Sequence, residues 1–184
     1  MSVQDDETRS RLVDMGWLLN DLVGDIKTPV DLAFQLKPAM DASNENYLSI
    51  NRLCLTGVLI GLCKLNEIFE HYGTEIKNFP VELREKIRAV KKEIEDRGMY
   101  AYRSKYLAHS FSKQKGCKPR PLSLRESVQA LMKIIDYGLD PVRANVFEFY
   151  KWAYEKDNEN SVVNVIYSCV KHIDHIVGGL GKRT

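Results

Sequence analysis

The chain has 184 residues, of which 44% are hydrophobic and 28% are charged, and its formal net charge is +2. This composition excludes collagen-like, low-complexity and wholly disordered chains, because the apolar side chains suffice to offset the conformational entropy lost on folding. The length predicts a single domain, 1–184, that buries roughly 70% of the surface of its unfolded chain. The acidic start of the chain and four cysteines without paired spacing predict a cytoplasmic protein with no signal peptide and no membrane span.

Apolar residues recur at three- and four-residue intervals through most of the chain, which predicts an all-α fold of about six to eight helices packed as a bundle. Residues 1–42 are expected to hold two N-terminal helices, because Thr28-Pro29 interrupts the first periodic run. A long helix over about 43–72 is expected to end at Gly73. Within the core, 43–156, and the C-terminal part, 157–184, further helices are expected at 80–97, 99–111, 123–138, 140–156 and 161–177.

Basic residues are concentrated between Arg97 and Arg125, a window that contains no Asp or Glu. These eight residues contribute +8, so the rest of the chain carries −6 (+2 minus +8). A concentrated positive charge on an otherwise acidic chain predicts contact with a polyanion, and the alternative is a solvated connection. The eight residues are Arg97, Arg103, Lys105, Lys113, Lys115, Lys118, Arg120 and Arg125.

The residues from Tyr102 to His109, Tyr-Arg-Ser-Lys-Tyr-Leu-Ala-His, place a permanent cation, hydroxyl groups and an imidazole at the expected end of a helix. Five residues separate Arg103 from His109. This Arg-x5-His motif, with its Leu-Ala-His ending and the long apolar helix before it, resembles the HEPN superfamily (higher eukaryotes and prokaryotes nucleotide-binding), and within it the abortive-infection type. The specific match covers residues 99–113. Active members commonly carry Asn, Asp or His after the arginine, where this chain has Ser104.

The resemblance implies a metal-independent endoribonuclease of the toxin or phage-defence (abortive infection) type, which needs no cofactor and forms a homodimer whose two motifs meet. Its partners would be RNA, a second copy of the chain and, for a toxin, a cognate antitoxin. The RNA would supply its 2′-hydroxyl as nucleophile, His109 would transfer protons, and Arg103 would stabilise the phosphorane charge. Residues expected to hold the RNA backbone are Lys105, Lys113, Lys115, Lys118 and Arg120, and the supporting residues are Ser104, Tyr106 and Glu67.

Helix geometry places Arg103 and His109 about 240° apart on an ideal α-helix, so they do not share one face. A combined site then requires the reach of the arginine, a frayed helix end or the second subunit. Alternatively, Arg103 forms a structural ion pair with Glu67 or Glu70 and His109 interacts with a helix end. That alternative describes a catalytically inactive HEPN-like module that binds RNA, a nucleotide or a protein. Packing is favoured over base stacking for the tyrosines that flank the arginine.

His172 and His175 lie three residues apart on the expected last helix, a spacing that can bind a transition metal. A closed site needs further ligands, so no metal site is predicted. A metal-dependent hydrolase built on this pair is the least favoured of the three functions.

Overall fold

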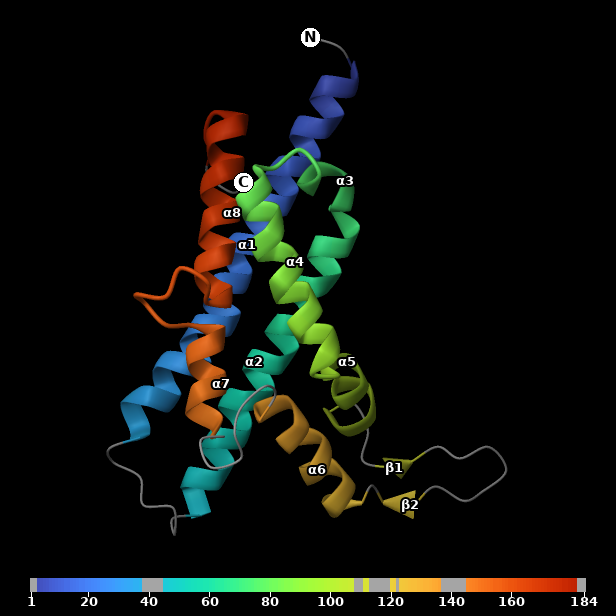
Figure 1. Cartoon of the computed structure of the whole chain (residues 1–184), viewed down its shortest axis with the longest axis vertical. Coiled ribbons are helices and arrows are strands. Elements are labelled where there is room, and N and C mark those ends of the chain that lie inside the picture. The colour runs from blue at the N-terminus through green and yellow to red at the C-terminus, as the bar shows by residue number, and fades with distance from the viewer. Residues whose placement is uncertain are drawn as a thin grey trace.

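The computed structural model describes residues 3–37, 45–107, 111–112, 120–121, 123–136 and 145–181. These residues form eight α-helices, which confirms the all-α bundle expected from the periodicity (Figure 1). A π-helical turn, η2 (Arg103–Leu107), follows α5, and two-residue strands β1 (Phe111–Ser112) and β2 (Arg120–Pro121) pair antiparallel. The helices are α1 (Val3–Leu36), α2 (Glu45–His71), α3 (Gly73–Ile76), α4 (Val81–Asp96), α5 (Met99–Tyr102), α6 (Leu124–Ile135), α7 (Val146–Ala153) and α8 (Val162–Val177).

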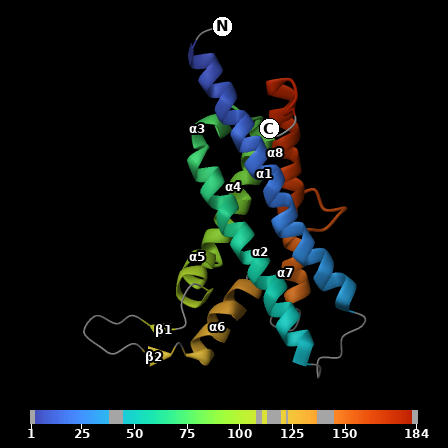
Figure 2. The same cartoon turned by 180° about the vertical axis from the view of Figure 1, so that it is seen from behind.

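The two long helices α1 and α2 form the frame of the bundle. Helices α7 and α8 pack against α1, and α4 packs against both α2 and α8 (Figures 1 and 2). Apolar side chains from these helices form one continuous core, in which Met15, Leu19, Leu62, Ile166 and Ile173 are fully buried. Helices α5 and α6 lie at one end of this frame, next to α2, and carry the motif region.

Helix α1 continues through Pro29, so the expectation of two N-terminal helices is wrong. Proline removes a backbone donor and usually ends or kinks a helix. Here the Pro29 ring lies against α2 at Gly57, where an added Cβ would be 3.1 Å from Pro29 Cγ. The helices also approach closely at Gly61, where a Cβ would lie 2.6 Å from Ile26 Cγ1. Packing of α1 against α2 at the proline and one turn before it therefore maintains the helix.

Two glycines with positive φ follow helices whose ends were expected at residues 97 and 177. Gly98 has φ 71° and lies between α4 and α5, so the helical conformation is interrupted there. Gly178 has φ 73° and ends α8, where the Gly179 amide donates to the Asp174 carbonyl oxygen over 2.8 Å. The expectation for Gly73 is wrong in part, because α2 ends before it but Gly73 begins the short helix α3.

The boundary at Ser123 is confirmed, because its hydroxyl oxygen accepts from the Glu126 amide over 3.4 Å and α6 starts at Leu124. The expected helix 140–156 is shorter in the structure. It begins as α7 at Val146, where Asn145 Oδ1 accepts from two backbone amides at 2.9 and 3.2 Å. The Asp140-Pro141 start lies outside the described residues.

The expected helix 99–111 is wrong at its C-terminal end. It changes from α to π geometry at Arg103, and Phe111 already belongs to strand β1, opposite Pro121. A π turn forms hydrogen bonds between residues i and i+5, so it is wider than an α turn. The periodicity of apolar residues carries no signal for this change.

Candidate functional site

Arg103 and Glu67 form an ion pair between η2 and α2. Arg103 Nη1 donates to Glu67 Oε1 over 2.7 Å, and the two side chains are 38% and 51% exposed. The sequence left Glu67 and Glu70 open as structural partners of the arginine, and the structure selects Glu67. An ion pair this exposed contributes at most about 1 kcal/mol to stability, so its main consequence is the orientation of the guanidinium.

The protonation states around this pair follow from its geometry. The hydrogen bond that Arg103 donates to Glu67 raises the pKa of Arg103, so the guanidinium keeps its charge and cannot act as a base. Burial raises the pKa of the neighbouring Cys63 thiol, although the charge of Arg103 opposes that shift. A thiol with a raised pKa stays protonated near neutral pH and is a poor nucleophile. Arg103 is therefore the group here that can act on an anion.

A partly buried set of polar contacts lies next to the pair and joins α5 to α2. The Tyr100 hydroxyl donates to the Cys63 carbonyl oxygen over 2.8 Å, and burial raises the pKa of Tyr100. Asn66 is buried, interacts with the Tyr100 side chain and donates through Nδ2 to Glu70 Oε1 over 3.3 Å. Sequence reasoning missed Tyr100, although it lies three residues before Arg103. These contacts hold α5 on α2 just before the turn that carries Arg103.

Arg103 is the first residue of the π turn η2, in which Ser104 and Lys105 are exposed. Single π turns are rare and occur frequently at functional sites. Because the turn is wider than an α turn, the 240° separation expected for a straight α-helix does not apply beyond Arg103. His109 lies outside the described residues, so the geometry of the Arg–His pair stays a prediction.

The surface formed by the basic residues between Arg97 and Arg125 is less positive than the sequence predicts, because acidic side chains from elsewhere pair with some of them. Arg97 is only 4% exposed and contacts Glu93 through Nε at 3.1 Å, so its expected place on a polyanion-facing surface is wrong. Lys105 Nζ donates to Glu126 Oε2 over 3.1 Å. With the Glu67 pair, at least three of the basic residues that the structure describes therefore have acidic partners from outside the window.

The remaining basic residues divide into two groups. Arg120 on β2 and Arg125 on α6 are exposed, and β1 and β2 extend from the α5–α6 end of the bundle (Figure 2). Lys113, Lys115 and Lys118, which were expected to hold the RNA backbone, lie outside the described residues. The described part of the expected RNA-binding set thus comprises Lys105 and Arg120.

Tyr102 and Tyr106 form an aromatic pair whose ring centroids are 5.3 Å apart, with the ring planes tilted by 40°. Tyr102 is buried in the core, as the packing interpretation expected, whereas Tyr106 is half-buried. Lys105 Nζ lies 5.0 Å from the centre of the Tyr106 ring, which is within the range of a cation–π contact. Tyr106, named as a supporting residue, therefore lies against a basic side chain of the motif.

The histidine pair of α8 does not extend into a larger ligand set. His172 contacts the edge of the Phe79 ring, with centroids 4.8 Å apart, and burial lowers the pKa of His172. His175 is exposed. Within the part of the chain that the structure describes, no cluster of three or more His, Cys, Asp or Glu side chains is suited to a metal ion.

Comparisons with known proteins add no identification: no family model, no curated protein and no solved structure matches the chain. None of the helices within the described residues is long and apolar enough to cross a membrane. Function must therefore be inferred from the site and from the motif itself.

Proposed function

We propose that the chain is a metal-independent endoribonuclease of the HEPN type, acting as a homodimer in toxin or phage-defence systems. One observation carries the proposal: a permanently charged, half-exposed Arg103 opens a π turn and is oriented by Glu67. The partly buried Tyr100 and Asn66 contacts hold α5 on α2 next to this arginine and support that orientation. A preorganised cation of this kind suits an anionic transition state better than a freely rotating surface arginine does.

The proposed chemistry is an attack of the RNA 2′-hydroxyl on the adjacent phosphorus. His109 accepts the proton of that hydroxyl or protonates the leaving 5′-oxygen, because an imidazole titrates near neutral pH. Arg103 donates hydrogen bonds to the phosphorane oxygens. The P–O5′ bond breaks as the new O2′–P bond forms, which leaves a 2′,3′-cyclic phosphate and a 5′-hydroxyl. The RNA provides the nucleophile, so the protein needs only proton transfer and charge stabilisation.

The other basic residues of the proposed site bind the RNA backbone and take no part in the reaction. Arg120, Lys113, Lys115 and Lys118 hold phosphates along the RNA, while Lys105 reaches them by exchanging its bond to Glu126. Binding of this kind depends on salt and shows little base preference. A cognate antitoxin would block this surface, and the second copy of the chain would complete the site.

The test compares cleavage of a mixed RNA in excess EDTA by the wild type and by Arg103→Ala and His109→Ala variants. Loss of the arginine should slow cleavage by about 10²–10³-fold, and loss of the histidine by about 10²–10⁴-fold. Arg88→Ala is the matched control, because Arg88 is an exposed arginine on α4, outside the motif. Unchanged rates in both motif variants would remove this site from the mechanism.

A second function is favoured by the same ion pair. Glu67 occupies the Nη1 donor of Arg103, and Ser104 replaces the residue common in active HEPN proteins. Both features fit a non-catalytic module that binds RNA, a nucleotide or a protein through its basic residues. This alternative predicts salt-sensitive RNA binding by the wild type, no cleavage, and no effect of His109→Ala on affinity.

A further inference from the structure

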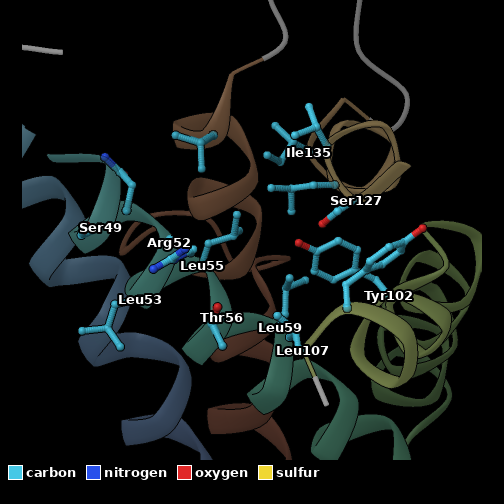
Figure 3. A pocket seen from close by; sticks show the side chains of 15 residues that line it. Ser49, Arg52, Leu53, Leu55, Thr56, Leu59, Tyr102, Leu107, Ser127 and Ile135 are labelled. Atoms are coloured by element: carbon cyan, nitrogen blue, oxygen red, sulfur yellow. The ribbon is translucent and has the colours of Figure 1, made fainter. Parts of the chain in front are cut away.

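A cavity of about 930 Å³ opens between α2, α5, η2, α6 and the start of α7, and neither Arg103 nor Glu67 is among its lining residues (Figure 3). Leu55, Thr56 and Leu59 of α2 lie across it from Ser127 and Ile135 of α6. Natural pockets for small ligands have volumes of about 300–1,000 Å³, so this space is large enough for a ligand.

Most of the cavity wall is aliphatic. Leucine, isoleucine and valine side chains come from α2, η2, α6 and α7, while the Tyr102–Tyr106 pair covers one side. Leu53 and Val128, which also line the cavity, are 69% and 48% exposed at its rim. Apolar side chains grouped around an open cavity mark a surface that a partner or ligand covers.

The charged side chains that line the cavity indicate which kind of molecule it can bind. Among the described residues that line the cavity, Arg52 is the single charged side chain and no carboxylate is present. Arg52 is exposed and forms no ion pair with another described residue. An arginine next to an aliphatic wall fits a molecule with an apolar body and one anionic end, because the guanidinium binds a carboxylate with two parallel hydrogen bonds.

A second copy of the chain fits this charge pattern less well. In a two-fold symmetric contact the same patch occurs on both subunits. A two-fold contact through the cavity would place both copies of Arg52 in one apolar interface, with no carboxylate among the described lining residues to pair with either. Charge complementarity therefore favours an anion.

We propose that this cavity binds an amphipathic carboxylate with a single aliphatic chain. The chain lies between α2 and α6, against Leu59 and Ile135, and the carboxylate accepts hydrogen bonds from Arg52. This site is separate from the Arg103–Glu67 site, and it stands whether or not the chain cleaves RNA.

The test is calorimetric titration of the full chain with dodecanoate and with dodecanol, a neutral ligand that has the same chain. The wild type should bind one dodecanoate and prefer it to dodecanol. Arg52→Gln should weaken dodecanoate binding by about tenfold while leaving dodecanol unchanged, as expected for loss of a charged hydrogen bond. Arg88→Gln, an exposed arginine far along α4, should bind both ligands as the wild type does.

Val128→Glu provides a second variant, because the exposed side chain can change without affecting the core. It places a carboxylate at the rim and should weaken dodecanoate binding by at least about tenfold through like-charge repulsion. No saturable binding by the folded wild type overturns the proposal, as does equal binding of both ligands with no effect of Arg52→Gln. A wild-type dimer that Val128→Glu converts to a monomer, without dodecanoate binding, assigns the cavity to a second copy and also overturns it.

Discussion

Replacing Arg97 by alanine tests how the motif end of the bundle is held together. Arg97 donates to the Ile134 carbonyl oxygen at the end of α6 and to Glu93 one turn earlier on α4. Its guanidinium carbon lies 4.7 Å from the centre of the Trp152 ring and 5.4 Å from that of Phe149, both on α7. One buried side chain therefore links α4 to α6 and α7.

The magnitude follows from these contacts. A hydrogen bond from a charged donor contributes about 1.5–3 kcal/mol, and a desolvated cation–π contact about 2 kcal/mol. Arg97→Ala also leaves Glu93 without its partner, but that side chain is 28% exposed and can be hydrated. We expect a loss of about 3–5 kcal/mol in the free energy of unfolding, the range found when one partner of a buried ion pair is removed.

Urea denaturation followed by circular dichroism measures this loss. Arg88→Ala on the same helix is the control, because an exposed substitution changes stability by only about 0.5 kcal/mol. At roughly 2–4 °C per kcal/mol, the Arg97 variant should also melt about 10 °C lower. If the Arg97→Ala variant unfolds at the same urea concentration as the Arg88→Ala control, the Arg97 side chain does not connect the three helices as described.

Three further predictions concern helix contacts and pH. Gly61→Ala should destabilise the fold by about 1–3 kcal/mol, because its Cβ would lie 2.6 Å from Ile26. Gly24→Ala, whose Cβ would have nothing within 4 Å, should stabilise the fold by about 0.5–1 kcal/mol. Urea denaturation measures both changes, and the opposite ranking of the two variants would contradict the close α1–α2 contact. The hydrogen bond from Arg11 lowers the pKa of Glu75, so the stability it contributes is present above about pH 4.3 and is lost as pH falls through the lowered value. Arg11→Gln should reduce the dependence of the unfolding free energy on pH in that acid range. An unchanged dependence would show that the Arg11–Glu75 pair does not cause it. Burial lowers the pKa of His172, so stability should fall as pH drops below about 6.5, and His172→Phe should remove that part of the pH profile; a variant that keeps it would show that another group titrates.

Features encoded by local sequence were predictable. The cap at Ser123, the α8 end at Gly178 and the break at Gly98 each depend on residues that are neighbours in the chain. The continuity of α1 through Pro29 was not predictable, because it depends on Gly57 of another helix. Local rules on proline describe an isolated helix, and here packing overrides them.

The candidate site shows the same division. The Arg103–Glu67 pair was one of two alternatives that the sequence offered, since both glutamates lie on the long helix before the motif. The spacing of apolar residues in the sequence did not indicate the π turn or the hydrogen bond from Tyr100 to α2. The acid-free basic window was misleading, because Glu126 and Glu93 lie outside it in sequence but against its cations in space. Charge along a chain predicts surface charge only where the fold brings no opposite charge alongside.

The most direct test of the proposed function is the chemical nature of the RNA ends produced in excess EDTA by the wild-type chain. The proposed function predicts fragments with 2′,3′-cyclic phosphate and 5′-hydroxyl ends, which should be absent when His109 is replaced by alanine. Fragments with 3′-hydroxyl and 5′-phosphate ends, or intact RNA after incubation with folded protein, would contradict it.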